Sequence, residues 1–315
     1  MKILASAKSL PSKVVTNDDL SKIVDTSHEW IVQRTGIEER RISEKNTSDL
    51  AYEAASLAIE KAGIDKNSID LIICATATPD NKFPSVACLV QEKLGLPDSV
   101  TAFDLNAACT GFIYGLKVAS AMLSTYHKRA LVIGAEVLSK IIDYSDRNTC
   151  VLFGDGAGAV VLEADGKNTE FFTKSLGQEE NLYAKASDLN LELDKTSVEE
   201  GFLKMNGSEV FKFAVAAMEE AVRGVLAQNE LDLDNVKLII PHQANKRIID
   251  FVAKKLKQDK EKFYINLNKY GNTSAASIAI ALDEALEEKK LVSGDKVLLV
   301  GFGAGLTWGA TILEI

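Results

Sequence analysis

The chain has 315 residues, of which 46% are hydrophobic, and a formal net charge of -9 at pH 7. This length suffices for one large or two medium domains, and the composition excludes a disordered or fibrous protein. The negative charge argues against non-specific binding to nucleic acid or to an anionic membrane, so an acidic ligand or partner would need a local basic patch.

The amino terminus lacks the sustained apolar core of a signal peptide, and no uncharged run reaches the roughly 18 residues of a membrane span. We therefore expect a cytoplasmic protein. The four cysteines stand singly in apolar surroundings, without a CxxC pair or a histidine at ligand spacing, so neither a disulfide nor a metal site is expected. These cysteines are Cys74, Cys88, Cys109 and Cys150.

Near the start of the chain, an aromatic side chain stands among several guanidinium groups. Trp30, Arg34, Arg40 and Arg41 lie in a segment that either binds an anion or forms a solvated amphipathic helix and turn. From about residue 50 to residue 62, apolar residues recur at helical spacing, which predicts an amphipathic helix.

Strand-like and helix-like segments then alternate along the chain. Because such alternation is typical of βαβ units, the sheet is expected to be largely parallel. The predicted elements are strands at residues 71–76, 101–105 and 129–134, with a helix near residues 85–94.

The segment from Thr110 to Thr125 carries one charged side chain, Lys117, and its apolar or small residues occupy every face. Such a helix belongs in the middle of a protein. Cys109 stands just before it, where unpaired backbone N–H groups and the helix dipole favour negative charge and can make a thiol ionise more readily. Most free cysteines are inert small hydrophobes, so this segment alone leaves both interpretations open.

The second half of the chain repeats the order of the first. Three segments match in the same order at a shift of about 150 to 170 residues, which predicts a duplicated α/β unit joined near residues 163–180. The repeat also predicts a second buried helix at residues 273–282, which carry no charge, and both buried helices are expected to lie between two sheets. The charge-rich residues 178–200 are expected to form a surface excursion. The matching pairs are AIEKAGIDKNSIDLIICATATPD with VLAQNELDLDNVKLIIPHQANKR, FDLNAACTGF with INLNKYGNTS, and GDGAGAVVLEA with GFGAGLTWGATILEI.

If a pseudo-twofold axis relates the two halves, the loops at matching strand ends converge on one site. Cys109 would then lie near Asn272, in the loop before the second buried helix, and near His242, which follows a predicted strand at residues 237–240. Taken singly, His242 could be a structural histidine and Asn272 a turn or capping residue. Together, three chemically compatible groups at equivalent strand ends favour an active site.

This trio can support two kinds of chemistry. A thiolate can carry an acyl group as a thioester, while a neutral histidine and a carboxamide can donate hydrogen bonds to an oxyanion or enolate. No carboxylate accompanies the trio in the sequence, which suits a carbanion formed by loss of CO2. A cysteine hydrolase is the competing interpretation, because Cys, His and Asn also form a protease-type triad.

Two glycine clusters superficially resemble dinucleotide-binding loops. Both lead into strand-like segments rather than helices, so the phosphate-on-helix mechanism does not apply. We interpret them as tight turns where backbones approach the site, and the N–H of Gly305 could join that of Cys109 as an oxyanion hole. The glycines are Gly154, Gly156, Gly158, Gly301, Gly303 and Gly305.

Several motifs spread over nearly the whole chain resemble the β-ketoacyl-acyl carrier protein synthase III family, the condensing enzymes that initiate type II fatty acid synthesis. The resemblance implies an α/β, thiolase-like five-layer αβαβα fold built from two similar halves, usually as a homodimer. Residues 1–170 would form the half that carries the nucleophilic cysteine, and residues 171–315 the half that carries the histidine and asparagine. The motifs are DTSHEWIVQRTGI, FPSVAC, NAACTGF, NTCVLFGDGAGAVVLE, PHQAN, GNTSAAS and GFGAGLTWG.

By this resemblance, Cys109 takes an acyl group from acyl-coenzyme A (acyl-CoA). His242 and Asn272 then stabilise the enolate that forms when malonyl-acyl carrier protein loses CO2, and the enolate attacks the acyl-cysteine to give β-ketoacyl-acyl carrier protein. Coenzyme A enters as part of a substrate, so no cofactor is expected. Starter enzymes of polyketide or quinolone pathways and related acyltransferases share the trio and remain an alternative.

The resemblance also assigns substrate-binding residues. Phe83 resembles a residue that reaches across the dimer into the partner's acyl pocket, and Arg147 would stack on the adenine opposite Trp30. The residues implied for coenzyme A are Trp30, Arg34, Arg147, Gly207, Phe211 and Asn245, and those implied for the acidic carrier protein are Lys212, Arg247, Lys254 and Lys255.

Overall fold

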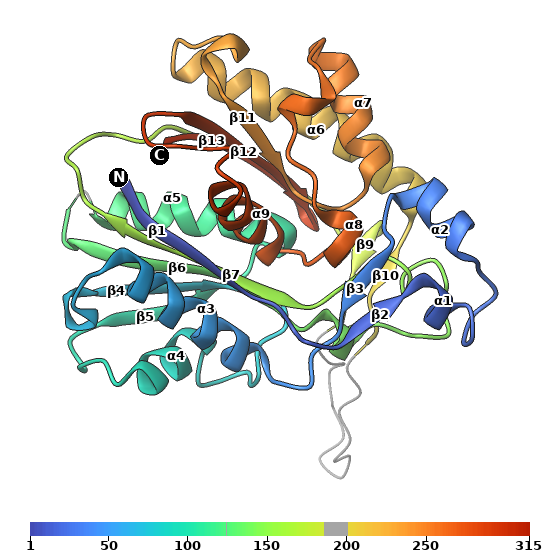
Figure 1. The fold of residues 1–315 in the computed structure, drawn as a ribbon, viewed down its shortest axis with the longest axis horizontal. Coiled ribbons are helices and arrows are strands. Elements are labelled where there is room, and N and C mark those ends of the chain that lie inside the picture. Colours follow the sequence, from blue (N-terminus) through green and yellow to red (C-terminus); the bar gives the residue numbers. More distant parts are fainter. Residues whose placement is uncertain (124, 186–200) are drawn as a thin grey trace.

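The computed structural model describes residues 1–123, 125–185 and 201–315, and these form five alternating layers of helices and sheets (Figure 1). Two helices cover the outer face of the first sheet, two lie between the sheets, and two cover the outer face of the second sheet. The expected five-layer αβαβα fold is therefore confirmed. The helices, in that order, are α3 (Thr47–Ala62) and α4 (Val86–Leu94), α5 (Gly111–Leu123) and α9 (Ala276–Glu287), and α6 (Gly207–Gln228) and α7 (Lys246–Leu256).

The two sheets have the same plan. In the first, the order is β1-β7-β6-β4-β5, with β6, β4 and β5 parallel and with β1 and β7 antiparallel to their neighbours. In the second, the order is β11-β12-β13-β8, with β11 and β12 parallel and the other pairs antiparallel. The strands are β1 (Lys2–Ser9), β4 (Leu71–Ala75), β5 (Thr101–Leu105), β6 (Arg129–Glu136), β7 (Gly156–Glu163), β8 (Phe171–Gln178), β11 (Leu238–Pro241), β12 (Lys296–Gly303) and β13 (Gly305–Glu314).

The expectation of a largely parallel sheet is wrong, because each sheet joins a parallel part to an antiparallel part. Strands β12 and β13 are separated only by Ala304, and such a short connection can join antiparallel strands but not parallel ones. Strands β1 and β8 were not predicted from the sequence. Strand β8 is largely exposed, and its sequence lacks the alternation of apolar and polar residues that marks a half-buried strand.

The duplication is visible in the strand pairing. Strands β8, β13, β12 and β11 take the places of β1, β7, β6 and β4, and a parallel bridge between Ile239 and Phe263 stands where β5 pairs with β4. The proposed division at residue 170 falls between β7, the last strand of the first sheet, and β8, the first of the second. The division of the chain into two domains at this residue stays a prediction, because α5 and α9 pack against both sheets.

Both predicted buried helices exist, with α5 beginning one residue later than expected and α9 displaced toward the chain end. Glycines let the backbone of α9 lie close to the first sheet. A Cβ at Gly134 would lie 2.3 Å from the carbonyl oxygen of Ala275, and one at Gly158 would lie 2.6 Å from the Cβ of Ala279. Gly156 and Gly158 lie within β7 and pack closely against α9, so the prediction that this cluster forms tight turns at the site is wrong for these two glycines.

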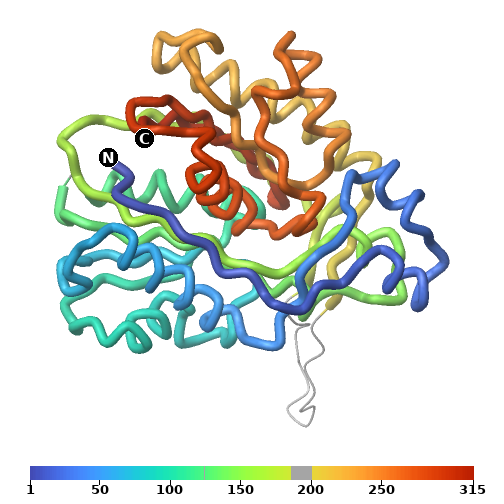
Figure 2. The backbone as a smooth tube through the Cα atoms, viewed as in Figure 1, coloured from blue at the N-terminus to red at the C-terminus, as the bar shows by residue number. Residues whose placement is uncertain are grey.

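The remaining elements gather at one end of the molecule, beside the C-terminal ends of β4 and β5 (Figure 2). Residues 186–200 of the predicted surface excursion lie outside the described part of the chain. Within the described residues, no helix is both long and apolar enough to cross a membrane. The elements at this end are α1 (Asn17–Leu20), α2 (His28–Thr35), α8 (Leu267–Tyr270), β2 (Val14–Thr16), β3 (Glu39–Arg41), β9 (Leu182–Tyr183) and β10 (Lys204–Met205).

Candidate active site

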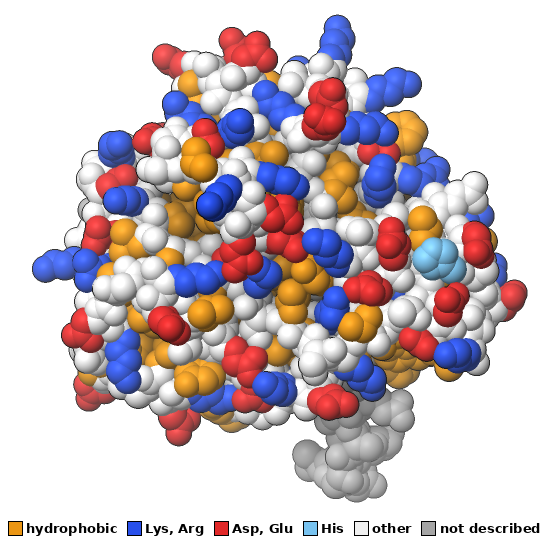
Figure 3. Space-filling model, viewed as in Figure 1, with side chains coloured by type: hydrophobic (Ala, Val, Ile, Leu, Met, Phe, Trp, Pro, Cys, Tyr) orange, Lys and Arg blue, Asp and Glu red, His pale blue; other side chains and the backbone are white. Residues whose placement is uncertain are grey.

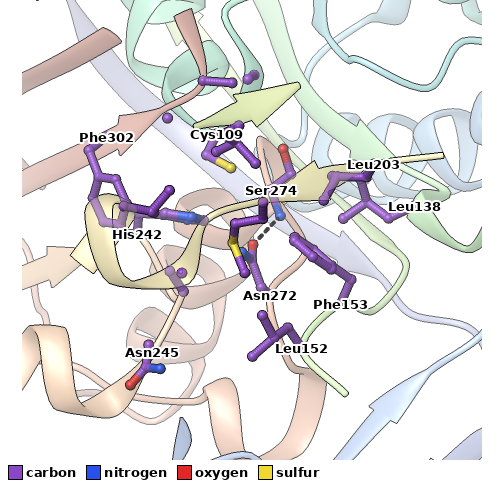
Figure 4. Close-up of a pocket in the computed structure, with 18 of the residues that line it drawn as sticks. Cys109, Leu138, Leu152, Phe153, Leu203, His242, Asn245, Asn272, Ser274 and Phe302 are labelled. Atoms are coloured by element: carbon purple, nitrogen blue, oxygen red, sulfur yellow. Dashed lines mark hydrogen bonds between the residues drawn. The ribbon is translucent and has the colours of Figure 1, made fainter. Parts of the chain in front are cut away.

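A cavity of about 1640 Å³ opens between the two halves, and residues from both halves line it. Cys109, His242 and Asn272 lie at its inner end, where the thiol and the imidazole point toward the same space (Figure 4). The convergence of these three side chains, expected from the duplication, is therefore seen in the structure. Six further lining residues are those assigned to coenzyme A, namely Trp30, Arg34, Arg147, Gly207, Phe211 and Asn245.

Cys109 is held in a short turn between β5 and α5. The turn is the 3-10 helix Ala108–Thr110, and Ala108 has φ +44°, a left-handed conformation that non-glycine residues rarely adopt. A Cβ at Gly303 would lie 2.9 Å from the backbone nitrogen of Cys109, so the end of β12 touches the nucleophile directly. In the described part of the chain, the Cys109 N–H donates no hydrogen bond to another residue.

The resting thiol of Cys109 does not ionise readily, contrary to the expectation from the sequence. Burial at the inner end of the cavity raises the pKa of Cys109 to about 12, and the nearby Glu136 carboxylate also raises it. Ser274 and the backbone N–H of Cys109 lower the pKa of the thiol without overcoming the effect of burial. Acylation of Cys109 therefore needs a group that accepts its proton.

His242 follows β11 and is almost completely buried, with 1% of its surface exposed. Its Nδ1 lies 2.7 Å from the Oγ of Ser277, and its ring packs edge-on against Phe302. Burial lowers the pKa of His242 to about 3, so the imidazole is neutral at physiological pH. The contact with Ser277 leaves Nε2 as the ring nitrogen that faces the cavity.

Asn272 is fixed by the other half of the molecule. Its backbone N–H donates to the carbonyl of Leu152 at 2.8 Å, and its carbonyl accepts from Gly154 at 3.1 Å. Its side-chain Oδ1 accepts from the backbone N–H of Ser274 at 2.9 Å, the bond drawn in Figure 4. Because Oδ1 is engaged in this way, the amide group of Asn272 presents its Nδ2 donors to the cavity.

Side chains from α2 and from the loop that contains Arg147 frame the outer part of the cavity. The guanidinium of Arg34 lies 4.6 Å from the ring centre of Trp30, and that of Arg147 lies 5.2 Å from it. Arg147 also donates to the backbone carbonyl of Asp25 at 2.7 Å. Arg40, from the same N-terminal segment, is buried and donates to protein acceptors, so it takes no part in this site.

The residues assigned to the carrier protein lie on the outer helices. Lys212 on α6 and Arg247, Lys254 and Lys255 on α7 are exposed, and basic side chains gather over α7 in Figure 3. Lys212 and Lys255 are paired with glutamates of α6, whereas Arg247 and Lys254 form no ion pair among the described residues. Phe83 is 86% exposed and does not line the cavity of the single chain.

Three polar residues next to the trio were not identified from the sequence. Ser274 and Ser277 contact Asn272 and His242, and Glu136 lies behind Cys109, which corrects the interpretation that no carboxylate accompanies the trio. The available signal for Glu136 was a single acidic residue at the end of a strand whose interior positions are apolar or glycine. Ser274 and Ser277 lie within the GNTSAAS motif, but nothing in the pattern distinguishes them from helix-capping residues.

Comparisons with known proteins agree with this geometry. The family model described as 3-oxoacyl-[acyl-carrier-protein (ACP)] synthase III matches residues 103–179, and the model of its C-terminal region matches residues 226–315. The chain is 51% identical over 325 residues to the beta-ketoacyl-[acyl-carrier-protein] synthase III of Natranaerobius thermophilus, covering 99% of this chain and 98% of that protein.

Two solved structures show the same overall arrangement. The crystal structure of 3-oxoacyl-[acyl-carrier-protein] synthase III from Aquifex aeolicus VF5 has a TM-score of 0.92 and 48% identity, covering 100% of this chain and 99% of that one. The priming beta-ketosynthase from the R1128 polyketide biosynthetic pathway has a TM-score of 0.93 but only 32% identity, covering 100% of this chain and 96% of that one.

Proposed function

This chain belongs to the 3-oxoacyl-[acyl-carrier-protein] synthase III family, and we propose that it uses Cys109, His242 and Asn272 to condense an acyl-CoA primer with malonyl-acyl carrier protein. The reaction is a decarboxylating Claisen condensation that yields β-ketoacyl-acyl carrier protein, coenzyme A and CO2, and it initiates fatty acid synthesis. The observation that carries the proposal is the convergence of the three side chains at the inner end of one cavity.

In the first half-reaction, the sulfur of Cys109 attacks the thioester carbonyl of acyl-CoA. The negative charge that develops on the carbonyl oxygen is stabilised by backbone N–H groups, for which we propose those of Cys109 and Gly305. Gly305 begins β13 and lines the same cavity, which supports its assignment. Collapse of the intermediate releases coenzyme A as a free thiol and leaves the acyl group on Cys109.

In the second half-reaction, His242 and Asn272 bind the thioester carbonyl of malonyl-acyl carrier protein. The low pKa of His242 keeps its ring neutral, and donation from the Ser277 hydroxyl to Nδ1 would leave the ring proton on Nε2, facing the cavity. Asn272 contributes an Nδ2 donor, because its Oδ1 is engaged by Ser274. Two neutral donors stabilise the enolate formed on loss of CO2, and the enolate attacks the acyl group on Cys109.

The geometry disfavours a cysteine hydrolase. In a protease-type triad the asparagine orients the histidine, and the histidine is the base that activates the cysteine. Here Ser277 contacts Nδ1 of His242, and Asn272 is bonded to Ser274 instead. A starter enzyme of secondary metabolism is also less favoured, since the identity is 51% to the Natranaerobius synthase but 32% to the priming ketosynthase.

We propose that the nucleotide of acyl-CoA binds at Trp30. An adenine between Trp30 and Arg147 needs a separation of about 7 Å, twice an ordinary contact distance, whereas the guanidinium of Arg147 now lies 5.2 Å from the Trp30 ring. Arg147 therefore has to move outward when the adenine enters, which stretches its hydrogen bond to Asp25.

Replacing Trp30 with alanine is expected to raise the KM for acyl-CoA about tenfold or more, because stacking of a base on an aromatic ring is worth about 1–3 kcal/mol. The rate of acylation at saturating substrate should stay near that of the wild type. Acyl-pantetheine, which lacks the nucleotide, is the matched control, and its KM should not change. An equal rise in KM for both substrates would contradict the assignment of Trp30 to the nucleotide.

We propose that the carrier protein docks on α7. Reversing the charge at Lys254, which has no ion pair in the described part of the chain, is expected to raise the KM for malonyl-acyl carrier protein about threefold to tenfold at low salt. The effect should shrink as salt is added, because an exposed charge is screened. Lys237→Glu, at the opposite end of β11, is the control and should leave the KM unchanged. Equal effects of both changes would refute this docking surface.

We further infer a cytoplasmic homodimer that needs no cofactor. The exposure of Phe83 on the single chain supports contact with a second copy, in which its ring would be covered. The chemistry proposed above uses only protein side chains, backbone N–H groups and the two thioester substrates, which supports a reaction without a further organic group.

A further inference from the structure

Helix α9 carries a buried carboxylate that no step described above uses. Glu284 has 7% of its surface exposed, and it lies about 12 Å along the helix from the first residue of α9, Ala276. Burial of a carboxylate costs free energy unless hydrogen bonds compensate for the lost water. The hydrogen-bond partners of Glu284 therefore indicate which part of the fold depends on it.

Three side chains of one segment donate to this carboxylate. Asn266 donates through Nδ2 to Oε2 at 2.7 Å, and the hydroxyl of Tyr270 and the ammonium of Lys269 donate to Oε1, each at 3.0 Å. Asn266 directly precedes α8, and Tyr270 is the last residue of that helix. Burial alone would raise the pKa of Glu284, but the hydrogen bonds from Asn266 and Lys269 lower it below its ordinary value, so the carboxylate is ionised at neutral pH. Glu284 therefore ties both ends of α8 to α9.

The bond at Tyr270 reaches Asn272 through a single glycine. Gly271 has φ +65°, and a Cβ at this position would lie 2.7 Å from the carbonyl oxygen of Leu152. The N–H of Gly271 donates to the carbonyl of Leu267 at 2.8 Å, and the next N–H, that of Asn272, donates to Leu152. Because the backbone has so little free space here, a shift of Tyr270 is transmitted to Asn272.

A buried glutamine connects the same segment to His242. Gln243 follows His242 in the chain, and 1% of its surface is exposed. Its Nε2 donates to the carbonyls of Pro241 and Tyr264 at 2.7 and 3.0 Å, and its Oε1 accepts from the backbone N–H of Asn266 at 3.0 Å. Two carbonyls on one side of the amide and an N–H on the other fix its orientation. Asn266 is therefore bonded both to the neighbour of one enolate donor and to the carboxylate that holds the loop of the other.

Helix α9 supports both enolate donors. Ser277, near its start, contacts Nδ1 of His242 at 2.7 Å, and Glu284 holds the loop that carries Asn272. None of the hydrogen bonds of Glu284 in the described part of the chain reaches Cys109. The nucleophile therefore depends on other elements than the two donors do.

We propose that Glu284 is a positioning residue that aims His242 and Asn272 at one thioester oxygen during condensation. A misplacement of about 1 Å can slow a reaction about 100-fold, so two donors on separate loops need a common support. The inference rests on the function proposed above for the two donors. The support consists of four buried side chains, which we call the α9 brace, namely Gln243, Asn266, Tyr270 and Glu284.

A purely structural role of Glu284 predicts a different pattern of rates. Loss of a buried, hydrogen-bonded carboxylate would then lower the melting temperature and slow acylation and decarboxylation by the same factor, because less protein is folded. A positioning role slows decarboxylation alone. The ratio of the two rates, measured on one preparation, does not depend on the folded fraction.

The test measures both half-reactions in Glu284→Gln, as acylation of Cys109 by acetyl-CoA and as release of CO2 from malonyl-acyl carrier protein. The amide keeps the size of the side chain but turns one acceptor oxygen into a donor, so at least one bond of the α9 brace is lost. Decarboxylation should be about 10- to 100-fold slower, while acylation should stay within about twofold of the wild-type rate. Tyr270→Phe removes a single bond and should slow decarboxylation about threefold to tenfold, again without slowing acylation.

Asp283→Asn is the matched control. Asp283 is the neighbouring residue on α9 and is also a buried carboxylate, with 1% of its surface exposed. Its variant should lower the melting temperature as Glu284→Gln does, but it should leave the ratio of the two rates unchanged. The reason is that its partners lie on β1 and α3 rather than on the donor loops, and they are Ser6, Lys8 and Lys61.

An equal loss of both half-reactions in Glu284→Gln, or the same selective loss in Asp283→Asn, would overturn the proposal. If Glu284→Gln does not fold, Tyr270→Phe decides by the same ratio, because it keeps the aromatic ring in place.

Crystal structures of the wild type and of the folded variant give a second readout that needs no substrate. The separation between Nε2 of His242 and Nδ2 of Asn272 should change by about 0.5 Å or more, and an unchanged separation would refute the positioning role. If the wild-type protein were neither acylated nor able to decarboxylate malonyl-acyl carrier protein, the proposed function would be wrong, while this separation would still decide the role of Glu284.

Discussion

Alanine at His242 or Asn272 is expected to separate the two half-reactions. Each variant should still accept an acyl group on Cys109, because neither side chain is assigned to that step. Each should release CO2 from malonyl-acyl carrier protein about 10²–10³-fold more slowly, the usual effect of losing one donor to a developing negative charge. Intact mass measures the acylation, and release of labelled CO2 measures the decarboxylation.

Asn272→Asp is the matched variant for this experiment. It keeps the Oδ1 that accepts from Ser274, so the loop should hold its shape, but it replaces the Nδ2 donors with a charged oxygen. Decarboxylation should be at least as slow as in Asn272→Ala, because the aspartate repels the enolate. If Asn272→Asp and His242→Ala both condensed at the wild-type rate, the assignment of the enolate donors would be wrong.

Alanine at Cys109 is expected to abolish condensation, with a loss of about 10⁴-fold or more, because no group remains to carry the acyl chain. The variant should keep His242 and Asn272 in place and should therefore still decarboxylate malonyl-acyl carrier protein slowly. The measurement is the mass of the carrier protein after incubation with acetyl-CoA and malonyl-acyl carrier protein.

Cys88→Ala is the control for Cys109→Ala. Cys88 is also partly exposed, but it lies on α4 outside the cavity, and its thiol contacts the carbonyl of Ala102. This variant should form β-ketoacyl-acyl carrier protein at the wild-type rate. Product formation by Cys109→Ala, at a rate near that of the control, would exclude Cys109 as the acyl carrier.

The sequence predicted the trio because each member carries a local signal. Cys109 precedes an apolar helix, His242 ends a buried strand, and Asn272 precedes the twin of that helix. The internal repeat then related these positions without any knowledge of contacts. The same repeat predicted the two central helices, whose lack of charge is a property of the sequence alone.

The electrostatics of the site could not be predicted in the same way. The helix N-terminus at Cys109 favours a thiolate, but desolvation by the surrounding protein outweighs it, and burial depends on how both halves close over the cavity. Glu136, whose charge raises the pKa of Cys109, comes from a different strand and lies 27 positions away in the chain. No local pattern links residues that only the packing of the two sheets brings together.

The direction of the strands at the sheet edges could not be predicted from the sequence either. Strand β1 runs antiparallel beside β7, whose paired residues lie 148 to 161 positions away along the chain. Strand β8 joins the second sheet by pairing with β13. Alternation of helices and strands predicts βαβ units, but it says nothing about a strand that returns to an edge without an intervening helix. The tight connection at Ala304 was visible in the sequence as a glycine cluster, although its hairpin was not predicted.

The most direct test of the account is to incubate the wild-type protein with acetyl-CoA alone, map the acyl group by peptide mass, and then add malonyl-acyl carrier protein. The account predicts one acetyl group per chain on the peptide that contains Cys109, and its loss on addition of the second substrate with release of CO2 and formation of acetoacetyl-acyl carrier protein. An acetyl group on another residue, or an acyl-cysteine that malonyl-acyl carrier protein does not discharge, would contradict it.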